Sequence, residues 1–286
     1  MKETIRIAVQ KSGRLNEGSV KLIRECGIKF SNGTGKLKTT ADNFPAEFLF
    51  LRDDDIPGYV EDGVADLGIV GANVAEEKRK NIKTVKPLGF SKCRLSLAIP
   101  RDKSYEGVQH FEGKNIATSY PRLLYDFLQK HKVSAHIHEI SGSVEIAPSI
   151  GLADAVCDLV SSGSTLLSNG LKEVETIYQS EAVLISRNDL STAKQTLLDK
   201  LLFRINAVQK GKNNKYILLN APVEATERII SLIPGMKSPT VMPLAMEGWN
   251  SIHSVINEDV FWEVIESLRE AGAQGILVVP IEKMIV

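Results

Sequence analysis

The sequence predicts an α/β protein in which two α/β lobes precede a smaller C-terminal module. Three observations support this fold class. Short apolar runs alternate with helical patterns from residue 5 onward, which is typical of mostly parallel sheets. The alternation starts again after Cys93, which indicates a second lobe. The last part has a different order of elements, and a polar turn at 211–214 precedes it.

The first lobe is expected to begin with a buried strand at 5–10. Asn16 is a suitable N-cap for a helix that ends near Gly27. The acidic run 53–55 starts another helix, with Pro57 in its first turn, where proline is tolerated. Further elements of this lobe are two strands and one helix, at 48–52, 66–70 and about 73–80.

The second lobe repeats the alternation. Tyr120-Pro121 is expected to open a helix that runs to about Lys130. Its strands are expected at 94–99, 115–118, 135–140 and 158–161, with a short helix at 144–150. Residues 181–185 return to the first lobe, and 191–209 form a long amphipathic helix. Two lobes with a returning chain enclose a cleft, which is a common place for ligands.

The C-terminal module is predicted to have the order β-α-β-β-α-β, which is the ferredoxin-like pattern. Gly272 is a suitable C-cap for its second helix. The strands are expected at 215–219, 240–245, 251–256 and 275–279, and the helices at 223–232 and 258–271. The predicted division is therefore a first lobe at 1–92 and 182–211, a second lobe at 93–181, and the module at 212–286.

Composition excludes several classes of function. Lys+Arg and Asp+Glu are both 35, so there is no basic excess for a nucleic-acid partner. Zero net charge permits self-association. The three cysteines lie far apart without zinc spacing, which favours a reduced, cytoplasmic chain. Residues 1–10 are too short and polar for a signal peptide, and no apolar run approaches the ~20 residues of a membrane span.

The most informative stretch is 145–166, which contains an apolar strand, a turn of small hydroxyl residues around Gly163, and a helix start. Such a turn offers backbone N–H groups and the positive end of a helix to a phosphate. Hydroxyl donors come from Ser161, Ser162, Ser164 and Thr165. No lysine follows the glycine, so this is neither a Walker motif nor a GxGxxG loop. On spacing alone, an ordinary capping loop with incidental serines remains an equal alternative.

Two acids, Asp154 and Asp158, precede this phosphate loop. Carboxylates repel a bare phosphate, so we expect them to accept hydrogen bonds from sugar hydroxyl groups. A phosphoribosyl group has both parts, a 5-phosphate for the loop and hydroxyl groups for the acids. The stretch therefore predicts a ribose-phosphate site.

The same stretch, Glu145 to Leu166, resembles the signature of the ATP phosphoribosyltransferase family. Six further segments are similar to motifs of that family: Gln10–Leu15, Arg52–Pro57, Asp66–Gly71, Cys93–Leu97, Ala117–Pro121 and Pro280–Lys283. The likeness covers nearly the whole chain, as in the long form of the enzyme with its own regulatory domain. One departure is Lys36, where the family often has arginine. Lysine keeps the positive charge, but it cannot make the bidentate hydrogen bonds of a planar guanidinium group.

This resemblance implies a pentosyltransferase that joins N1 of the ATP adenine to C1 of 5-phosphoribosyl 1-pyrophosphate, the first step of histidine biosynthesis. The phosphoribosyl substrate would bind Glu145, Asp154, Asp158, Ser161, Ser162, Gly163, Ser164 and Thr165. Lys11, Arg14 and Arg52 would act as catalytic cations on ATP phosphates or the departing pyrophosphate. Mg²⁺ would be carried mainly by substrate phosphates.

The ATP side would include Lys11, Gly13, Arg14, Asp66 and Tyr120. Alternatives stay open for several residues. Asp66 and Asn73 either border the cleft or cap a helix. Tyr120 either stacks on adenine or packs over the helix start. Arg52 either meets phosphate or pairs with a neighbouring aspartate.

For the C-terminal module, the resemblance implies feedback inhibition by histidine at Asn220, Met236, Thr240 and Gly275, with an equilibrium between dimer and hexamer. Asn220 replaces an aspartate found in some members. Two rival functions remain. The two-lobed part is also similar to type II periplasmic-binding-protein folds, which bind small molecules without catalysis. The second rival function is that of a phosphoribosyltransferase that uses another nucleophile.

Overall fold

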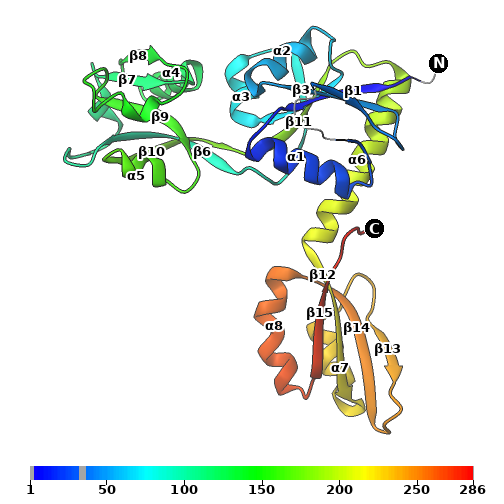
Figure 1. The fold of residues 1–286 in the computed structure, drawn as a ribbon. Coiled ribbons are helices and arrows are strands. Elements are labelled where there is room, and N and C mark those ends of the chain that lie inside the picture. Colours follow the sequence, from blue (N-terminus) through cyan, green and yellow to red (C-terminus); the bar gives the residue numbers. More distant parts are fainter. Residues whose placement is uncertain (1–2, 32–36, 286) are drawn as a thin grey trace. The chain divides into compact units, whose positions relative to one another are not determined.

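The computed structural model describes residues 3–31 and 37–285, so position 36 lies outside the described residues. The chain forms two compact units (Figure 1). The first holds the described residues up to Arg24 together with Ile28–Leu198. The second, called here the C-terminal unit, holds Glu25–Gly27 and the described residues from Asp199 onward.

The first lobe is built on a six-stranded sheet with the order β2-β3-β1-β4-β11-β5. Its central strand β1 pairs in parallel with β3 and β4, and β11 returns antiparallel to β4 (Figure 1). The strands are β1 (Ile5–Gln10), β2 (Lys38–Thr40), β3 (Ala46–Leu51), β4 (Leu67–Gly71), β5 (Ile82–Pro87) and β11 (Ala182–Arg187). The helices are α1 (Arg14–Glu25), the 3-10 turn η1 (Asp53–Asp55), α2 (Ile56–Glu61) and α3 (Ala72–Lys78). The predicted return of the chain to the first lobe is confirmed.

The second lobe has a five-stranded sheet with the order β10-β6-β9-β7-β8. Its strands are β6 (Cys93–Pro100), β7 (Asn115–Thr118), β8 (His136–Glu139), β9 (Ala155–Val160) and β10 (Leu171–Ser180). Its helices are α4 (Pro121–Lys130) and α5 (Ser164–Ser168), with 3-10 turns η2 (Val108–Phe111) and η3 (Val144–Ile146). Strand β9 is central, parallel to β7 and antiparallel to β6.

A long helix, α6 (Thr192–Lys212), runs from the first unit into the C-terminal unit. That unit has an antiparallel sheet of order β13-β14-β12-β15, with two helices packed on one face. Its elements are β12 (Asn214–Pro222), η4 (Val223–Ala225), α7 (Thr226–Leu232), β13 (Thr240–Pro243), β14 (Trp249–Asn257), α8 (Glu258–Glu270) and β15 (Gln274–Pro280). The predicted βαββαβ order is confirmed.

Alternating burial shows how this smaller sheet forms its core. Along β12, Ile217, Leu219 and Ala221 are fully buried, while the residues between them are more exposed. The buried set packs with Ile252 of β14 and Leu268 of α8. The period of two therefore gives the sheet one face against the helices and one face open.

Some local predictions are wrong. Asn16 is not an N-cap, because α1 already begins at Arg14. The residue before the helix is Gly13, which has a positive φ of 86°. Asn16 is buried, and its side-chain amide donates to the Gln10 carbonyl at the end of β1. The expected helix at 144–150 is only the turn η3. Strands β2, β5 and β10 were not predicted, since they alternate weakly and carry many charged or polar residues.

Candidate active site

The phosphate loop follows the central strand of the second lobe. Strand β9 ends at Val160, and Ser161-Ser162-Gly163 lead directly into α5. Gly163 has a φ of 80°, a left-handed conformation that other residues adopt only with strain. The Ser162 and Ser164 hydroxyl groups are 3.0 Å apart and both are exposed. Because α5 has only five residues, backbone N–H and hydroxyl donors, more than a helix dipole, make this turn suited to an anion.

Two acids of the second lobe lie together near this loop. Asp158 is on β9, and Glu145 is in η3, which packs against β9. Burial raises the pKa of Asp158, the hydrogen bond from the Leu159 amide opposes that shift, and the charge of Glu145 adds to it. The structure therefore brings together two carboxylates, one of them partly desolvated, beside the phosphate loop.

Asp154 lies apart from these two acids, at the start of β9. It precedes β9, whereas the loop follows β9. At a rise of ~3.3 Å per residue, Asp154 and Asp158 are about 13 Å apart along the strand. The Asp154 carboxylate instead accepts the backbone N–H of Asn115 at 2.8 Å and joins the start of β9 to β7.

The basic turn of the first lobe lies where two parallel strands end. Gln10 of β1 pairs with Leu51 of β3, so Lys11 and Arg52 follow neighbouring strands at one edge of the sheet. The Lys11 N–H donates to the Leu51 carbonyl at 2.8 Å and holds the turn in place. Within the described part of the chain, Lys11, Arg14 and Arg52 are exposed and have no ion-pair partner. Three unneutralised cations therefore stand at the carboxyl edge of this sheet.

A pocket of about 350 Å³ joins the basic turn to the phosphate loop. The first lobe contributes residues from the ends of β1 and β4, the start of η1 and the first turn of α3. The segment between the lobes contributes Ser91 and Lys92, and the second lobe contributes Cys93, Leu159 and Ser161. The remaining lining residues are Gln10, Gly13, Arg14, Leu15, Asp53, Gly71, Asn73 and Val74. The volume and the cations suit an anionic small molecule.

Tyr120 lies where the two lobes meet. Its ring packs against the buried clusters of both lobes. Burial raises the pKa of Tyr120, with the charge of Asp158 as the next cause. The following helix α4 is capped from the first lobe, because the Glu77 carboxylate of α3 accepts the N–H groups of Arg122 and Leu123, both at 2.9 Å. Tyr120 is therefore a half-buried contact between the lobes.

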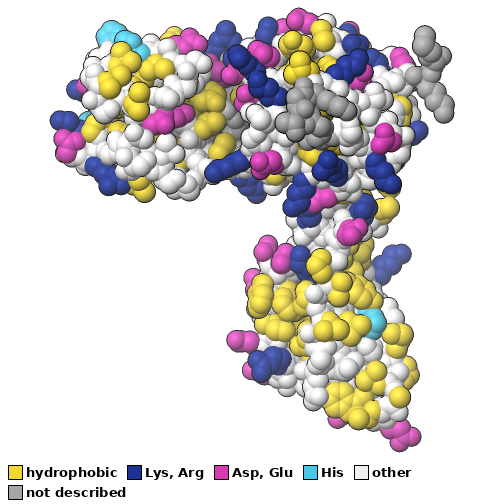
Figure 2. Space-filling model, in the orientation of Figure 1, with side chains coloured by type: hydrophobic (Ala, Val, Ile, Leu, Met, Phe, Trp, Pro, Cys, Tyr) yellow, Lys and Arg dark blue, Asp and Glu magenta, His cyan; other side chains and the backbone are white. Residues whose placement is uncertain are grey.

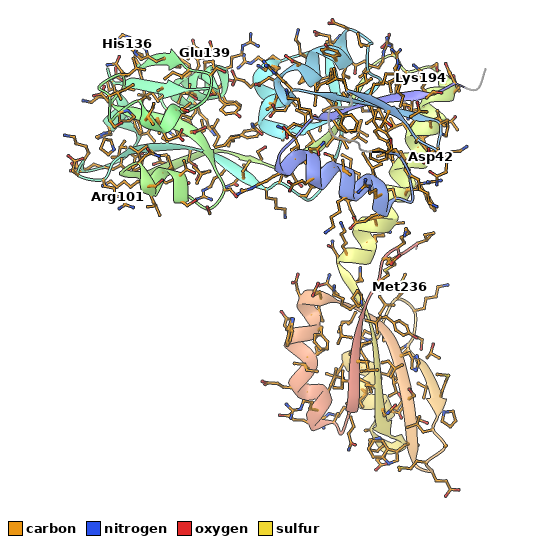
Figure 3. All side chains as sticks on the ribbon, in the orientation of Figure 1. Asp42, Arg101, His136, Glu139, Lys194 and Met236 are labelled. Carbon is orange, nitrogen blue, oxygen red and sulfur yellow. The ribbon has the colours of Figure 1, made fainter. Side chains whose placement is uncertain are left out.

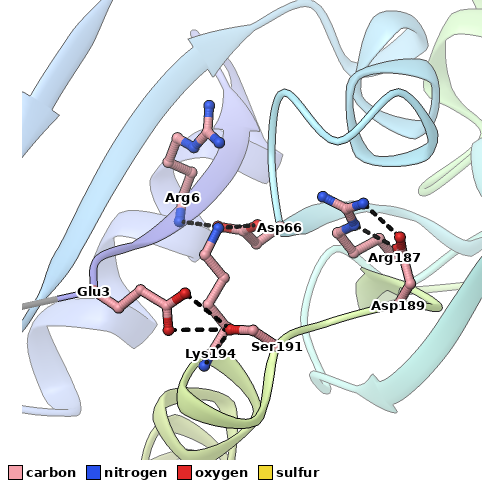
Figure 4. A network of polar contacts seen from close by, with 7 residues as sticks. All are labelled: Glu3, Arg6, Asp66, Arg187, Asp189, Ser191 and Lys194. Atoms are coloured by element: carbon pink, nitrogen blue, oxygen red, sulfur yellow. Dashed lines mark hydrogen bonds and ion pairs between the residues drawn. The ribbon is translucent and has the colours of Figure 1, made fainter.

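Asp66 lies outside the lining of this pocket. It precedes β4, so it lies at the opposite end of that strand from Gly71. Asp66 is fully buried, and its carboxylate accepts the Arg6 backbone N–H at 2.8 Å and contacts Lys194 Nζ at 2.7 Å (Figure 4). Nearby, Ser191 bonds both carboxylate oxygens of Glu3 (Figure 4). This group joins α6 to the sheet of the first lobe.

One contact that the sequence did not reveal supports the phosphate loop. Arg94 of β6 pairs with Glu173 of β10 through two nitrogens, and its third nitrogen donates to the Ser161 carbonyl at 3.3 Å. The hydrogen bond with Glu173 raises the pKa of Arg94, and burial opposes this shift. The sequence offered one signal, since Arg94 belongs to the Cys93–Leu97 motif.

In the C-terminal unit, two of the four residues expected to bind histidine are neighbours. A Cβ atom on Gly275 would lie 3.5 Å from Asn220 Nδ2. Thr240 is exposed on β13, two strands from β12. Met236 is half exposed in the loop between α7 and β13 (Figure 3). His253, which pairs with Thr240, also bonds Tyr216 at 2.7 Å and Ser251 at 3.0 Å, and the sequence did not single it out.

The described residues contain no group of three or more His, Cys, Asp or Glu side chains arranged to hold a metal ion. They also contain no helix that is both long and apolar enough to cross a membrane.

Comparison with known proteins connects this geometry to one family. A family model described as "HisG: ATP phosphoribosyltransferase" matches residues 52–207, and one described as "HisG, C-terminal domain" matches residues 211–283. The chain is similar to the ATP phosphoribosyltransferase of Cytophaga hutchinsonii, with 60% identity over 285 residues and 100% of each chain covered. It is similar to that of Phocaeicola vulgatus with 57% identity over 281 residues, covering 98% of this chain and 99% of the relative.

Solved structures agree on the two-lobed fold. A chain of the ATP phosphoribosyl transferase (HisG:HisZ) complex from Thermotoga maritima matches with a TM-score of 0.60 and 25% identity, covering 71% of this chain and 98% of that one. A histidine kinase sensor domain with similarity to periplasmic binding proteins matches with a TM-score of 0.51 and 11% identity, covering 73% and 92% of the two chains. The second likeness shows the fold alone, so the predicted periplasmic-binding-protein-like architecture is confirmed without its function.

Proposed function

The chain belongs to the ATP phosphoribosyltransferase family, and on that premise we propose how its residues divide the work of the reaction. The enzyme is a pentosyltransferase that performs the first step of histidine biosynthesis. Adenine N1 of ATP displaces pyrophosphate from C1 of 5-phosphoribosyl 1-pyrophosphate. N1 already has a free lone pair, so the protein needs no strong base. It must align the two substrates and stabilise the charge that develops as pyrophosphate leaves.

The phosphoribosyl substrate binds at the second lobe in this proposal. The 5-phosphate takes the N–H and hydroxyl donors of the phosphate loop, Ser161, Ser162, Gly163, Ser164 and Thr165. The ribose hydroxyl groups donate to the paired carboxylates Asp158 and Glu145. Asp154 has no part in this site, because its carboxylate is engaged at the far end of β9.

ATP and the departing pyrophosphate bind at the first lobe. Lys11, Arg14 and Arg52 are unpaired cations within the described residues, at the edge where parallel strands end. Arg14 and Gly13 share one pocket with Ser161 of the phosphate loop, and this shared pocket is the single observation that carries the proposal. A polyphosphate held by Arg14 therefore lies next to a phosphoribosyl group held by the loop.

Mg²⁺ fits this arrangement as an ion carried by the substrates. Magnesium prefers phosphate oxygens, with one or two protein carboxylates and its own waters. The described residues offer no three-ligand cluster, but Asp158 and Glu145 supply two carboxylates near the loop. When bound, the ion neutralises pyrophosphate oxygens. The chain's own cations orient the same group.

The C-terminal unit belongs to the family of HisG C-terminal domains, which gives the enzyme its feedback regulation by histidine. We propose that histidine binds on the open face of its sheet near Asn220 and Gly275, with Thr240 and Met236 at the edge. The functional division would be residues 1–92 and 182–211 for ATP, 93–181 for the phosphoribosyl substrate, and 212–286 for histidine.

Self-association into dimers and hexamers is a further part of the proposal. Figure 2 shows hydrophobic side chains gathered over the C-terminal unit. Its open sheet face includes exposed apolar residues on three strands, Tyr216, Met242, Leu277 and Val279. An apolar face of this kind favours association of copies.

The free state of the three cysteines supports a cytoplasmic location for the enzyme.

The test is a direct assay. The protein is incubated with ATP, 5-phosphoribosyl 1-pyrophosphate, Mg²⁺ and a pyrophosphatase, and the N1-phosphoribosyl adduct is followed by its absorbance and mass. A reaction without the phosphoribosyl substrate is the control. Absence of the adduct with folded protein would overturn the proposed function and favour a binding protein without catalysis.

A further inference from the structure

Asn73 occupies the first turn of α3, two residues after β4 ends at Gly71. Its side chain is 2% exposed and lines the pocket between the lobes. A Cβ atom on Gly71 would lie 2.4 Å from Asn73 Oδ1, so the glycine leaves the space that this side chain fills. Asn73 is therefore held in a defined position at the buried side of the pocket.

Only one end of the Asn73 amide is satisfied. Ser180, at the end of β10, accepts the Asn73 backbone N–H at 3.1 Å and donates its hydroxyl proton to Asn73 Oδ1 at 2.7 Å. The amide nitrogen Nδ2 is buried and has no acceptor among the described residues. A buried N–H group without an acceptor destabilises the protein until a partner is supplied. The pocket is the place from which a ligand can supply one.

The charges of the pocket indicate what kind of acceptor this is. Arg14 and Lys92 both line it, both are exposed, and neither has an ion-pair partner among the described residues. Among the described residues, Asp53 is the one acid in the lining. Cations beside a neutral N–H donor are suited to phosphate oxygens, which only accept hydrogen bonds.

We propose that Asn73 is a substrate-binding residue whose Nδ2 donates a hydrogen bond to a phosphate oxygen of the polyphosphate held in the pocket by Arg14 and Lys92. This inference rests on the proposed function. The oxygen belongs to the triphosphate of ATP or to the pyrophosphate of the phosphoribosyl substrate. Adenine is the less suitable partner, because recognition of its amino edge needs an acceptor as well as a donor, and Oδ1 is engaged by Ser180.

The first experiment measures binding of inorganic pyrophosphate and of adenosine by isothermal titration calorimetry. Asn73→Ala removes the donor and should weaken pyrophosphate binding about tenfold, as expected for one hydrogen bond to a charged group. Asn73→Asp keeps an acceptor for Ser180 but places a negative charge against phosphate, and should weaken binding about a hundredfold or more. Adenosine affinity should stay within about twofold of wild type.

Asn188→Ala is the matched control. It also removes a bonded asparagine, since Asn188 Nδ2 donates to the Asn81 carbonyl and side chain, but it lies outside the pocket lining. It should leave pyrophosphate binding unchanged. Melting temperatures identify any variant that fails to fold. If Asn73→Asp does not fold, the pyrophosphate affinity of Asn73→Ala alone provides the test.

Steady-state kinetics on the wild type and Asn73→Ala identify the source of the phosphate. A rise in KM for ATP assigns the bond to the triphosphate, and a rise in KM for the phosphoribosyl substrate assigns it to the pyrophosphate. Equal pyrophosphate affinity of wild type and both variants, or a loss confined to adenosine, overturns the inference. If wild type forms no adduct at all, the proposed function has failed, which is a separate result.

Discussion

Replacing Asp158 with asparagine is expected to lower activity while leaving the fold at least as stable. Burial raises the pKa of Asp158, with a further contribution from the charge of Glu145, so the folded protein bears a cost for keeping this carboxylate ionised. Asparagine has nearly the same volume and no charge. The substitution removes that cost and also removes the charge assistance to ribose hydroxyl groups.

The size of the kinetic effect follows from hydrogen-bond energies. A hydrogen bond to a charged acceptor is about 1 kcal/mol stronger than one to a neutral acceptor. At about 1.4 kcal/mol for each factor of ten, one such bond changes KM about fivefold and two bonds about 30-fold. We therefore expect Asp158→Asn to raise KM for the phosphoribosyl substrate about 5- to 30-fold, with KM for ATP nearly constant.

Asp154→Asn is the matched comparison four residues earlier. Its carboxylate accepts the Asn115 N–H at 2.8 Å, away from the phosphate loop. This change should cost about 1 kcal/mol of unfolding free energy, which is a fall in melting temperature of about 2 °C for a chain of this size. Both KM values should stay near wild type. Initial rates and thermal melts on both variants make the comparison, and an equal rise in KM for Asp154→Asn would refute our placement of the acids.

The pH dependence has a definite sign. When the pKa of a carboxyl group is higher in the folded than in the unfolded protein, the folded protein binds more protons at pH values between the two pKa values. Stability is therefore lost as the pH rises through this range. Below ~4 the group is protonated in both states and the cost disappears. The gain in melting temperature of Asp158→Asn over wild type should therefore grow from acidic to neutral pH. A gain that is constant with pH would contradict this account of Asp158.

Three further predictions concern other parts of the molecule. Arg94→Lys loses the two-nitrogen pairing with Glu173 and the bond to the phosphate-loop carbonyl, so kcat/KM for the phosphoribosyl substrate should fall about tenfold, with little change in that for ATP. Lys194→Met leaves the fully buried Asp66 without its cation, and urea unfolding should show a loss of about 3–5 kcal/mol with unchanged KM values. Deletion of residues 212–286 should leave adduct formation measurable but abolish inhibition by histidine, and unchanged inhibition in the truncated enzyme would refute the role of this unit.

The sequence determined the features that depend on neighbours along the chain. Apolar runs predicted β1 and β7 to the residue, and Pro57 and Pro121 marked helix starts. Gly163 marked the phosphate loop, because only a residue tolerant of positive φ suits that turn. The family motifs identified the reaction. These are local signals, set by side-chain periodicity and backbone sterics within a few residues.

The tertiary structure decided which of the predicted residues share a pocket. Asp154 and Asp158 are close in sequence, but the extended strand between them separates them by about 13 Å. Asp66 meets Lys194, and Asn73 meets Ser180, across 128 and 107 residues of chain respectively. Strand β10 mixes charged and apolar residues, so its sequence pattern does not predict a strand. It is defined by its antiparallel pairing with β6. Contacts of this kind depend on strand register and on the packing of one lobe against the other, and no local pattern of residues encodes them.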